Sequence, residues 1–284
     1  MPKQHGSISV TELKKSYKNK EVLKNVSFSV PGGTIYALLG TNGAGKTTIV
    51  KILSTLLKPD GGSAAIHGFD VVSQEREVRK LISLTGQFTA VDDVLTGREN
   101  LHLIGQLIRL PDVKRKTGEW LSFFDLEDAA DRKVSTYSGG MRRRLDIAMS
   151  LMVHPQVLFL DEPTTGLDPQ NRIAMWDFVK NLAKNGTTVF LTTQYLEEAE
   201  SLADCVGILH KGEILAEGTP QYLKEILPKR GARLHFSNEE NAAKAMELLS
   251  EHGIPVDGLE PNLPSLEDVF LTLIDGNEED NRHV

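Results

Sequence analysis

Short apolar runs separated by turn residues fill the first forty positions and predict strands. We expect strands at residues 8–13, 22–30 and 34–39, with Pro-Gly-Gly at 31–33 as a turn. The last run is continuously apolar, which is typical of a strand buried on both faces of a sheet. After a glycine-rich segment, apolar residues recur at helical spacing. They predict a helix through Ile49, Ile52, Leu53, Leu56 and Leu57 that ends at Pro-Asp-Gly-Gly, residues 59–62.

The pattern changes between residues 89 and 155. Strand-like runs disappear, and residues 99–110 and 117–124 have the apolar spacing of helices. This predicts a helical subdomain, at about 89–155, inserted into an α/β core. Strand patterns return at residues 157–160 and 187–191, and a hairpin at 206–215 turns at Lys211 and Gly212.

A smaller unit is predicted after residues 218–220. It contains a strand at 233–236, a helix at 239–252, an extended piece at 254–259 and a last helix that opens with a capping-box pattern, Ser265 to Asp268. A chain of 284 residues exceeds the usual size of one domain. We therefore expect a first domain at 1–220, an accessory domain at 221–276 and a disordered tail at 277–284.

Composition and charge narrow the possible functions. The chain is 40% hydrophobic and 25% charged, as is usual for a globular protein, and its net charge of -7 argues against nucleic acid as the main partner. The single cysteine, Cys205, excludes an internal disulfide, and we expect it to be a buried strand residue. The chain has no signal-peptide pattern and no apolar run of membrane-spanning length. We expect a cytoplasmic protein that reaches a membrane only through a partner.

Residues 40–47, Gly-Thr-Asn-Gly-Ala-Gly-Lys-Thr, match the phosphate-binding loop pattern between a strand and a helix. Glycines let consecutive backbone N–H groups turn toward phosphates, and the helix start adds its positive dipole end. Lys46 is predicted to reach the β- and γ-phosphates of ATP, and Thr47 to bind Mg²⁺. The alternative is a glycine-rich turn that matches by chance. The predicted nucleotide contacts are Gly40, Asn42, Gly43, Ala44, Gly45, Lys46, Thr47 and Thr48.

Two carboxylates follow the apolar run 157–160. Charged groups at the end of a buried strand are costly to place unless they have a role. We interpret Asp161 as the residue that holds Mg²⁺ and Glu162 as the base that polarises the attacking water. The alternative is an exposed junction between strand and loop.

Ser138, Gly139 and Gly140 open a helix and form a second anion-binding helix start. Three arginines follow at residues 142–144, where cations oppose the helix dipole. They either point to solvent or lie near a bound anion. Since one chain does not need two triphosphate sites, we expect this helix start to face a nucleotide held by another copy.

With these motifs in this order, the chain resembles the nucleotide-binding subunits of ATP-binding cassette (ABC) transporters. Within that superfamily it is most similar to the daunorubicin-resistance-type ATPases that serve drug exporters, and the likeness covers nearly the whole chain. Further motifs that carry the resemblance lie at residues 84–87, 90–101, 137–148, 161–169, 192–199 and 264–270.

The resemblance implies further roles for single residues. Tyr17 would stack on adenine, although it is equally well explained as a strand-packing aromatic. Gln87 would touch Mg²⁺ and link the core to the helical subdomain; taken alone, it would be a surface residue. The segment 138–140 would close over the γ-phosphate bound by the opposite subunit, and Asp168 would bridge the two sites.

Two positions depart from the commonest family pattern. Met141 stands where many members have glutamine, a variation typical of this branch. Gln194 stands where most members have a histidine that contacts the γ-phosphate. An amide can donate a hydrogen bond there but cannot carry a positive charge, so we expect a catalytic Gln194 to make a weaker contact.

The resemblance implies a P-loop NTPase (RecA-like) α/β core with an antiparallel β-subdomain, an inserted helical subdomain and a small α+β C-terminal domain. It implies the Mg-ATP-hydrolysing subunit of an exporter, working as a homodimer, or a heterodimer with a paralogue, beside a transmembrane permease at the inner face of the membrane. The alternatives are a non-transport ABC ATPase that acts on ribosomes or nucleic acid, and an importer subunit.

Overall fold

The computed structural model describes residues 6–18, 20–86, 90–226, 239–252, 265–267, 269–272 and 274. The chain forms two compact units, Met1–Glu217 and Gly218–Val284.

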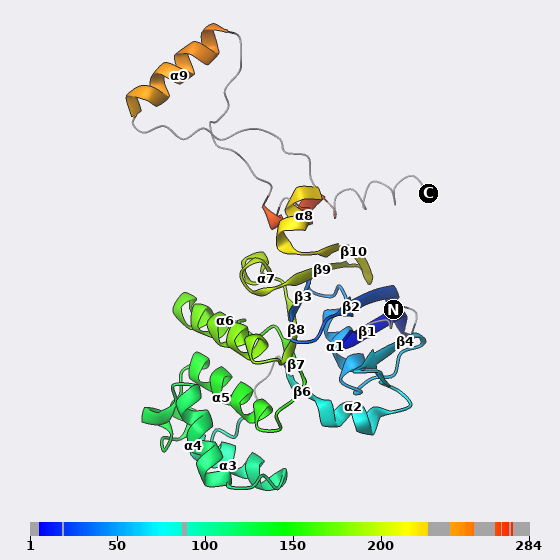
Figure 1. The fold of residues 1–284 in the computed structure, drawn as a ribbon, viewed down its shortest axis with the longest axis vertical. Coiled ribbons are helices and arrows are strands. Elements are labelled where there is room, and N and C mark those ends of the chain that lie inside the picture. Colours follow the sequence, from blue (N-terminus) through cyan, green and yellow to red (C-terminus); the bar gives the residue numbers. More distant parts are fainter. Residues whose placement is uncertain are drawn as a thin grey trace. The chain divides into compact units, whose positions relative to one another are not determined.

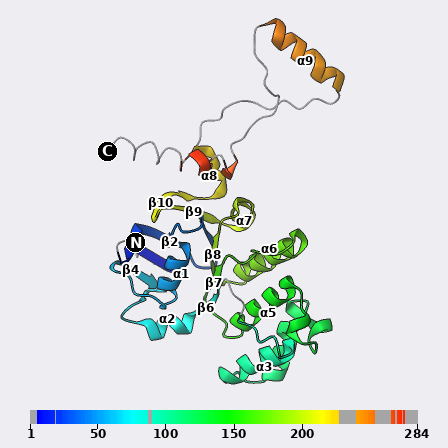
Figure 2. The same ribbon diagram turned by 180° about the vertical axis from the view of Figure 1, so that it is seen from behind.

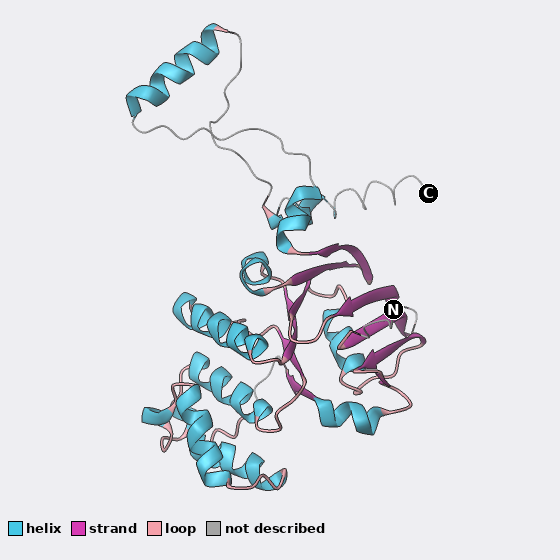
Figure 3. Cartoon of the chain, in the orientation of Figure 1, coloured by secondary structure: helices cyan, strands magenta, loops and turns pink. Residues whose placement is uncertain are grey.

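A six-stranded, largely parallel sheet is the centre of the first unit (Figures 1 and 3). Its order is β10-β9-β3-β8-β7-β6, and β9, β3, β8, β7 and β6 pair in parallel. The three central strands are buried along their whole length, as continuous apolar runs predict. The strands are β3 (Ile35–Leu39), β6 (Ile82–Thr85), β7 (Val157–Asp161), β8 (Thr188–Thr193), β9 (Cys205–His210) and β10 (Glu213–Gly218).

A four-stranded antiparallel sheet in the order β2-β1-β4-β5 packs beside the parallel sheet. Buried and exposed residues alternate along β2, so one face of that strand meets the core and the other meets solvent. The strands are β1 (Ile8–Tyr17), β2 (Lys20–Val30), β4 (Gly61–Ile66) and β5 (Phe69–Asp70), and helix α2 (Glu75–Leu81) leads from β5 to β6.

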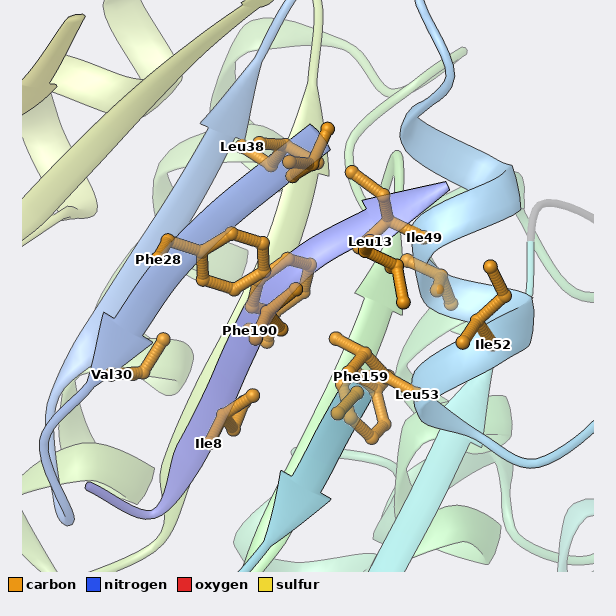
Figure 4. Close-up of a cluster of buried hydrophobic side chains, with 14 of the residues drawn as sticks. Ile8, Leu13, Phe28, Val30, Leu38, Ile49, Ile52, Leu53, Phe159 and Phe190 are labelled. Carbon is orange, nitrogen blue, oxygen red and sulfur yellow. The ribbon is translucent and has the colours of Figure 1, made fainter. Parts of the chain in front are cut away.

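The main hydrophobic core lies between the two sheets and helix α1 (Lys46–Leu53) (Figure 4). Phe28 of β2 stacks on Phe190 of β8 with ring centroids 5.7 Å apart. Ile49 and Leu53 of α1 are fully buried in the same cluster. This core fixes the start of α1 against the carboxyl ends of the central strands.

The other face of the parallel sheet is covered by helices α5 (Gly139–Leu151), α6 (Pro169–Lys184) and α7 (Leu196–Leu202) (Figures 1 and 2). Helices α3 (Gly97–Leu107) and α4 (Val113–Phe123) pack on α5, with short turns η1 (Glu127–Ala129) and η2 (Val134–Thr136) between α4 and α5. Phe178 of α6 contacts Phe124 at a centroid distance of 4.4 Å. Aromatic packing thus ties the helical subdomain to the core.

The second unit contains α8 (Pro220–Ile226) and α9 (Glu239–Glu251). The described residues between 266 and 274 are helical, and Leu266 and Val269 are buried. The strand at 233–236, the extended piece at 254–259 and the tail at 277–284, all expected from the sequence, lie outside the described residues.

The fold class predicted from the sequence is confirmed, whereas several element boundaries were wrong. The first strand continues to Tyr17 rather than ending at residue 13, and α4 starts at Val113 rather than 117. Cys205 is a strand residue, as expected, but it is only partly buried as the first residue of β9. The boundary between the compact units lies at Glu217–Gly218.

Candidate functional site

The loop between β3 and α1 has a backbone that only glycine accommodates at two positions. Gly45 is the N-cap of α1 with φ 115°, and a Cβ there would lie 2.7 Å from Leu23 Cδ2. A Cβ at Gly40 would lie 2.4 Å from the carbonyl oxygen of Leu209. The left-handed conformation and the close approach both exclude larger residues. The loop therefore turns tightly into the start of α1.

Lys46, the first residue of α1, is buried at the base of this loop. Its ammonium donates to the carbonyl oxygens of Gly40 at 2.7 Å and Thr41 at 3.2 Å, and it lies 3.4 Å from Glu162 Oε1. Burial lowers the pKa of Lys46, and the carboxylates of Glu162 and Asp161 oppose that shift. The neighbouring carboxylates therefore help to keep the ammonium charged inside the protein.

Asp161 ends β7 with a buried carboxylate that accepts hydrogen bonds from two hydroxyl groups. Thr47 Oγ1 donates to Asp161 Oδ2 at 3.1 Å, and Thr192 Oγ1 donates to Oδ1. Thr47 comes from α1 and Thr192 from β8, so three elements meet at this carboxylate. Hydroxyl and carboxylate oxygens side by side are a donor set that suits Mg²⁺.

Glu162 follows directly and has a left-handed backbone, with φ 51°. Its N–H donates to the carbonyl oxygen of Thr192 at 3.1 Å, and Thr165 Oγ1 donates to its carboxylate at 3.3 Å. A left-handed conformation costs a non-glycine residue about 1–2 kcal/mol. The chain accepts this cost where the turn directs the carboxylate toward Lys46.

Lys46, Thr47 and Glu162 line a cavity of about 420 Å³, whereas the predicted contacts Gly40, Ala44 and Asp161 are not among its lining residues. Tyr17, at the end of β1, lines the cavity and is 46% exposed, and the ammonium of Lys15 lies 5.9 Å from the centroid of its ring. The other lining residues are Lys20, Val22, Asn42, Gly43, Gly45, Lys46, Thr47, Thr48 and Glu162. Most of the predicted nucleotide contacts thus surround one cavity.

The start of α5 does not line that cavity. Ser138 caps the helix by accepting a hydrogen bond from the N–H of Met141 at 3.2 Å. Gly139 is exposed with open space around it, whereas Gly140 is buried against Asn171, whose side chain a Cβ would meet at 2.6 Å. This helix start faces outward from its own chain.

Asp168 and Gln194 also lie outside the residues that line the cavity. Asp168 caps α6 and accepts hydrogen bonds from the backbone and side-chain amides of Asn171. These bonds hold the pKa of Asp168 below its usual range. Gln194 follows β8 and is partly buried. Gln87 lies outside the described residues.

Sequence reasoning missed two buried charged groups close to the site. Arg143 of α5 is 5% exposed and turned inward, unlike Arg142 and Arg144. Glu198 of α7 is fully buried. Burial raises the pKa of Glu198, an effect that the hydroxyl of Thr193 partly opposes. In the sequence both residues resemble their exposed neighbours, so no local pattern distinguishes them.

Comparison with known proteins identifies the family to which this chain belongs. Residues 23–165 match the family model described as ABC transporter. The chain belongs to the ABC transporter family. It is therefore an ATP-binding, ATP-hydrolysing subunit of the ABC type.

Two of the curated relatives are named as drug resistance ATP-binding proteins. The daunorubicin/doxorubicin resistance ATP-binding protein DrrA of Streptomyces peucetius is 47% identical over 253 residues, which cover 88% of this chain and 77% of the relative. The doxorubicin resistance ATP-binding protein DrrA of Mycobacterium tuberculosis is 53% identical over 222 residues, covering 77% of this chain and 67% of the relative.

Solved ABC structures share the fold. The ATP-binding subunit of an ABC transporter superposes with a TM-score of 0.72 at 25% identity over 94% of this chain and 99% of that chain. A dimeric ATP-binding cassette in a post-hydrolysis state bound to ADP and Pi superposes with a TM-score of 0.67 at 25% identity, over 75% of this chain and 98% of that chain. Among the described residues of the present ABC subunit, no helix is long and apolar enough to cross a bilayer.

Proposed function

We propose that this ABC ATPase powers the export of drug-like compounds through a separate membrane permease. The proposal is supported by two relatives, 47% and 53% identical to this chain, that are named as drug resistance ATP-binding proteins. The observation that carries the chemistry is the cavity in which Lys46, Thr47 and Glu162 come together. We expect the protein to work at the inner face of the membrane, with no nucleic acid partner.

We infer that Mg-ATP binds in this cavity. The Lys46 ammonium would offset part of the phosphate charge and the backbone N–H groups of the loop would donate hydrogen bonds to phosphate oxygens, while Thr47 and Asp161 would hold Mg²⁺. Thr47 Oγ1 already lies 3.1 Å from Asp161 Oδ2, so one ion can be shared by both groups. We propose that Tyr17 stacks on the adenine and, on the family resemblance alone, that Gln87 is a further Mg²⁺ ligand. When bound, Mg²⁺ stabilises the negative charge that develops on the transferred phosphoryl group.

Glu162 acts as the base that polarises the attacking water. Its carboxylate lies 3.4 Å from the ammonium of Lys46, so the base and the phosphate-binding cation share one location. Gln194, at the end of β8, donates a neutral hydrogen bond to the γ-phosphate. A positioned general base accelerates proton transfer by about 10²- to 10⁴-fold. Loss of the Glu162 carboxylate should therefore stop turnover without removing the groups that bind phosphate.

Two chains are needed to complete each site. Ser138 and Gly139 at the start of α5 are exposed and are not among the residues that line their own chain's cavity, and a Cβ on Gly139 would meet no atom of the described residues within 4 Å. A helix start of this kind binds anions. We propose that it closes over the γ-phosphate held by the partner subunit, and that Asp168 lies at the junction of the two sites.

The proposal is tested with the Glu162→Gln variant of the full chain. Light scattering should give the mass of one 31.3 kDa chain without nucleotide and twice that mass with Mg-ATP, because the variant binds ATP but does not hydrolyse it. ATP without Mg²⁺ is the control for the metal. A variant that binds Mg-ATP yet stays monomeric at every concentration tested would refute the two-chain site.

A second experiment tests whether the chain binds a membrane permease. The tagged chain is purified from detergent-solubilised membranes of its own host after cross-linking, and the captured proteins are identified by mass spectrometry. We expect a protein with several membrane-spanning segments in a fixed ratio to this chain. Capture of ribosomal proteins in its place would refute the role in export.

A further inference from the structure

Three consecutive arginines on α5 have three different environments. Arg142 forms an ion pair with Asp93 at 2.9 Å, and Arg144 donates to the carbonyl oxygen of Phe124 at 3.0 Å; both side chains remain partly exposed. Arg143 is buried and faces the core. Successive residues on a helix point about 100° apart, so neighbours of the same type can serve different purposes.

The guanidinium of Arg143 donates to backbone carbonyls on both sides of Glu162. Its Nε lies 3.1 Å from the carbonyl oxygen of Pro163, and one terminal nitrogen lies 3.4 Å from that of Asp161. The other terminal nitrogen lies 2.7 Å from the carbonyl oxygen of Gly86, just past the end of β6. One side chain thus holds the backbone around the proposed base and the end of a neighbouring strand.

Asp146, one turn further along α5, completes the arrangement. Its carboxylate lies 3.3 Å from Arg143 and accepts the N–H of Ala90 at 3.0 Å. Gly86 and Ala90 are therefore both attached to α5, one through each member of the ion pair. Burial raises the pKa of Asp146, which Arg143 opposes, and lowers that of Arg143, which Asp146 opposes. Each group keeps the other charged.

This geometry favours arginine over every other residue. The planar guanidinium reaches several acceptors at fixed angles, whereas a lysine ammonium is a single point of charge. Burying a cation is costly unless it is hydrogen-bonded and paired, and Arg143 is both. A cation needed only to balance charge would not require three backbone carbonyls from two separate segments.

We propose that Arg143 is a positioning residue that joins the start of α5 to the backbone flanking Glu162. Arg143 lies four residues after Gly139, so it sits about 6 Å along the helix axis from the exposed start of α5. Glu162, the proposed base of one site, and the start of α5, which is proposed to contact the partner's nucleotide, then move together as one rigid body. The inference rests on the two-chain site proposed above and names the residue that links its two halves.

The test compares Arg143→Lys with Arg142→Lys and Arg144→Lys, the matched controls on the same helix. Steady-state ATPase is measured in the otherwise native chain, and Mg-ATP-dependent dimerisation in the Glu162→Gln chain. Because the hydrogen bonds of Arg143 within the described residues go to Gly86, Asp146, Asp161 and Pro163 and not to Lys46 or its loop, the ATP affinity of Arg143→Lys should stay within about 2-fold. Misplacement of reacting groups by about 1 Å can cost 10²-fold in rate, so kcat should fall at least about 10-fold. The dimer dissociation constant should rise about 10-fold, and the controls should change either value by less than about 2-fold.

Three results would overturn the inference. The first is an Arg143→Lys chain with native kcat and native dimerisation. The second is a loss of ATP binding, kcat and folded fraction in equal proportion, which would mean that Arg143 only stabilises the fold. The third is failure of both Arg143→Lys and Arg143→Gln to fold, with the same meaning. If the Glu162→Gln parent itself does not dimerise, the two-chain proposal fails first, and this inference fails with it.

Discussion

Alanine substitutions at the two glycines that begin α5, Gly139 and Gly140, should separate an effect on folding stability from an effect on dimerisation. Gly139 has open space where a Cβ would stand, whereas a Cβ on Gly140 would lie 2.6 Å from the Cγ and Oδ1 atoms of Asn171. The side chain of Asn171 cannot move freely, because its amide donates to Asp168. Alanine should therefore be accepted at Gly139 by the isolated chain and rejected at Gly140.

The size of the effect follows from two opposing terms. Replacing glycine by alanine in a helix stabilises it by up to about 1 kcal/mol, less at a helix end. At Gly140 the added methyl also overpacks its surroundings, which costs about 1–3 kcal/mol. The helix term is similar at both positions, so Gly140→Ala should be less stable than Gly139→Ala by about 1–3 kcal/mol. A second change, Asn171→Ala, should recover most of this difference in the Gly140→Ala chain.

Urea unfolding followed by tryptophan fluorescence measures this difference, because Trp120 and Trp176 lie in α4 and α6, close to the helices concerned. Function is measured on the same samples. Gly139→Ala should fold normally and bind ATP, yet lose Mg-ATP-dependent dimerisation, since its methyl group occupies the face offered to the partner. Equal stability of the two variants would refute the packing argument. Native dimerisation and turnover of Gly139→Ala would refute the proposed contact with the second nucleotide.

Three further outcomes are expected. Lys46→Ala should abolish ATP binding or reduce turnover by at least about 10²-fold, and an undiminished steady-state rate would contradict its role. Gln194→His restores a chargeable donor, so ATPase activity should be kept or raised; complete inactivity would show that the loop depends on glutamine. Because burial raises the pKa of Glu198 in the folded chain, its ionisation destabilises the fold increasingly as pH rises above the unfolded pKa of about 4.3. The melting temperature of Glu198→Gln should therefore rise relative to that of the native chain as the pH increases above about 4.3, and a difference independent of pH would contradict this reasoning.

The central sheet could be predicted from the sequence because its strands are buried on both faces. Continuous apolar runs such as residues 35–39 and 157–160 are too short for helices and are followed directly by glycine or by acidic residues. The glycine-rich loop is similarly specific, because a φ of 115° at Gly45 allows little besides glycine. Where the local residues alone determine the local backbone, the sequence is sufficient to predict the structure.

The parts that escaped prediction depend on tertiary contacts. Residues 61–85 form two short strands, a helix and an edge strand, each too brief to show a period. Arg143 cannot be distinguished from its neighbours without knowing which side of α5 meets the sheet. Glu198 stands in the run Glu-Glu-Ala-Glu and resembles a surface acid, although it is fully buried. Only the packed structure assigns these residues to the interior.

The ion pair between Lys46 and Glu162 also bears on which molecules can enter the cavity. A phosphate oxygen that binds the Lys46 ammonium has to displace a carboxylate 3.4 Å away, in surroundings that are largely shielded from water. A ligand with several negative charges competes well for that ammonium, whereas a nucleoside or monophosphate competes poorly. We therefore expect the cavity to favour highly charged nucleotides over weakly charged ones, and the same exchange of partners would free the Glu162 carboxylate for its proposed role as the base.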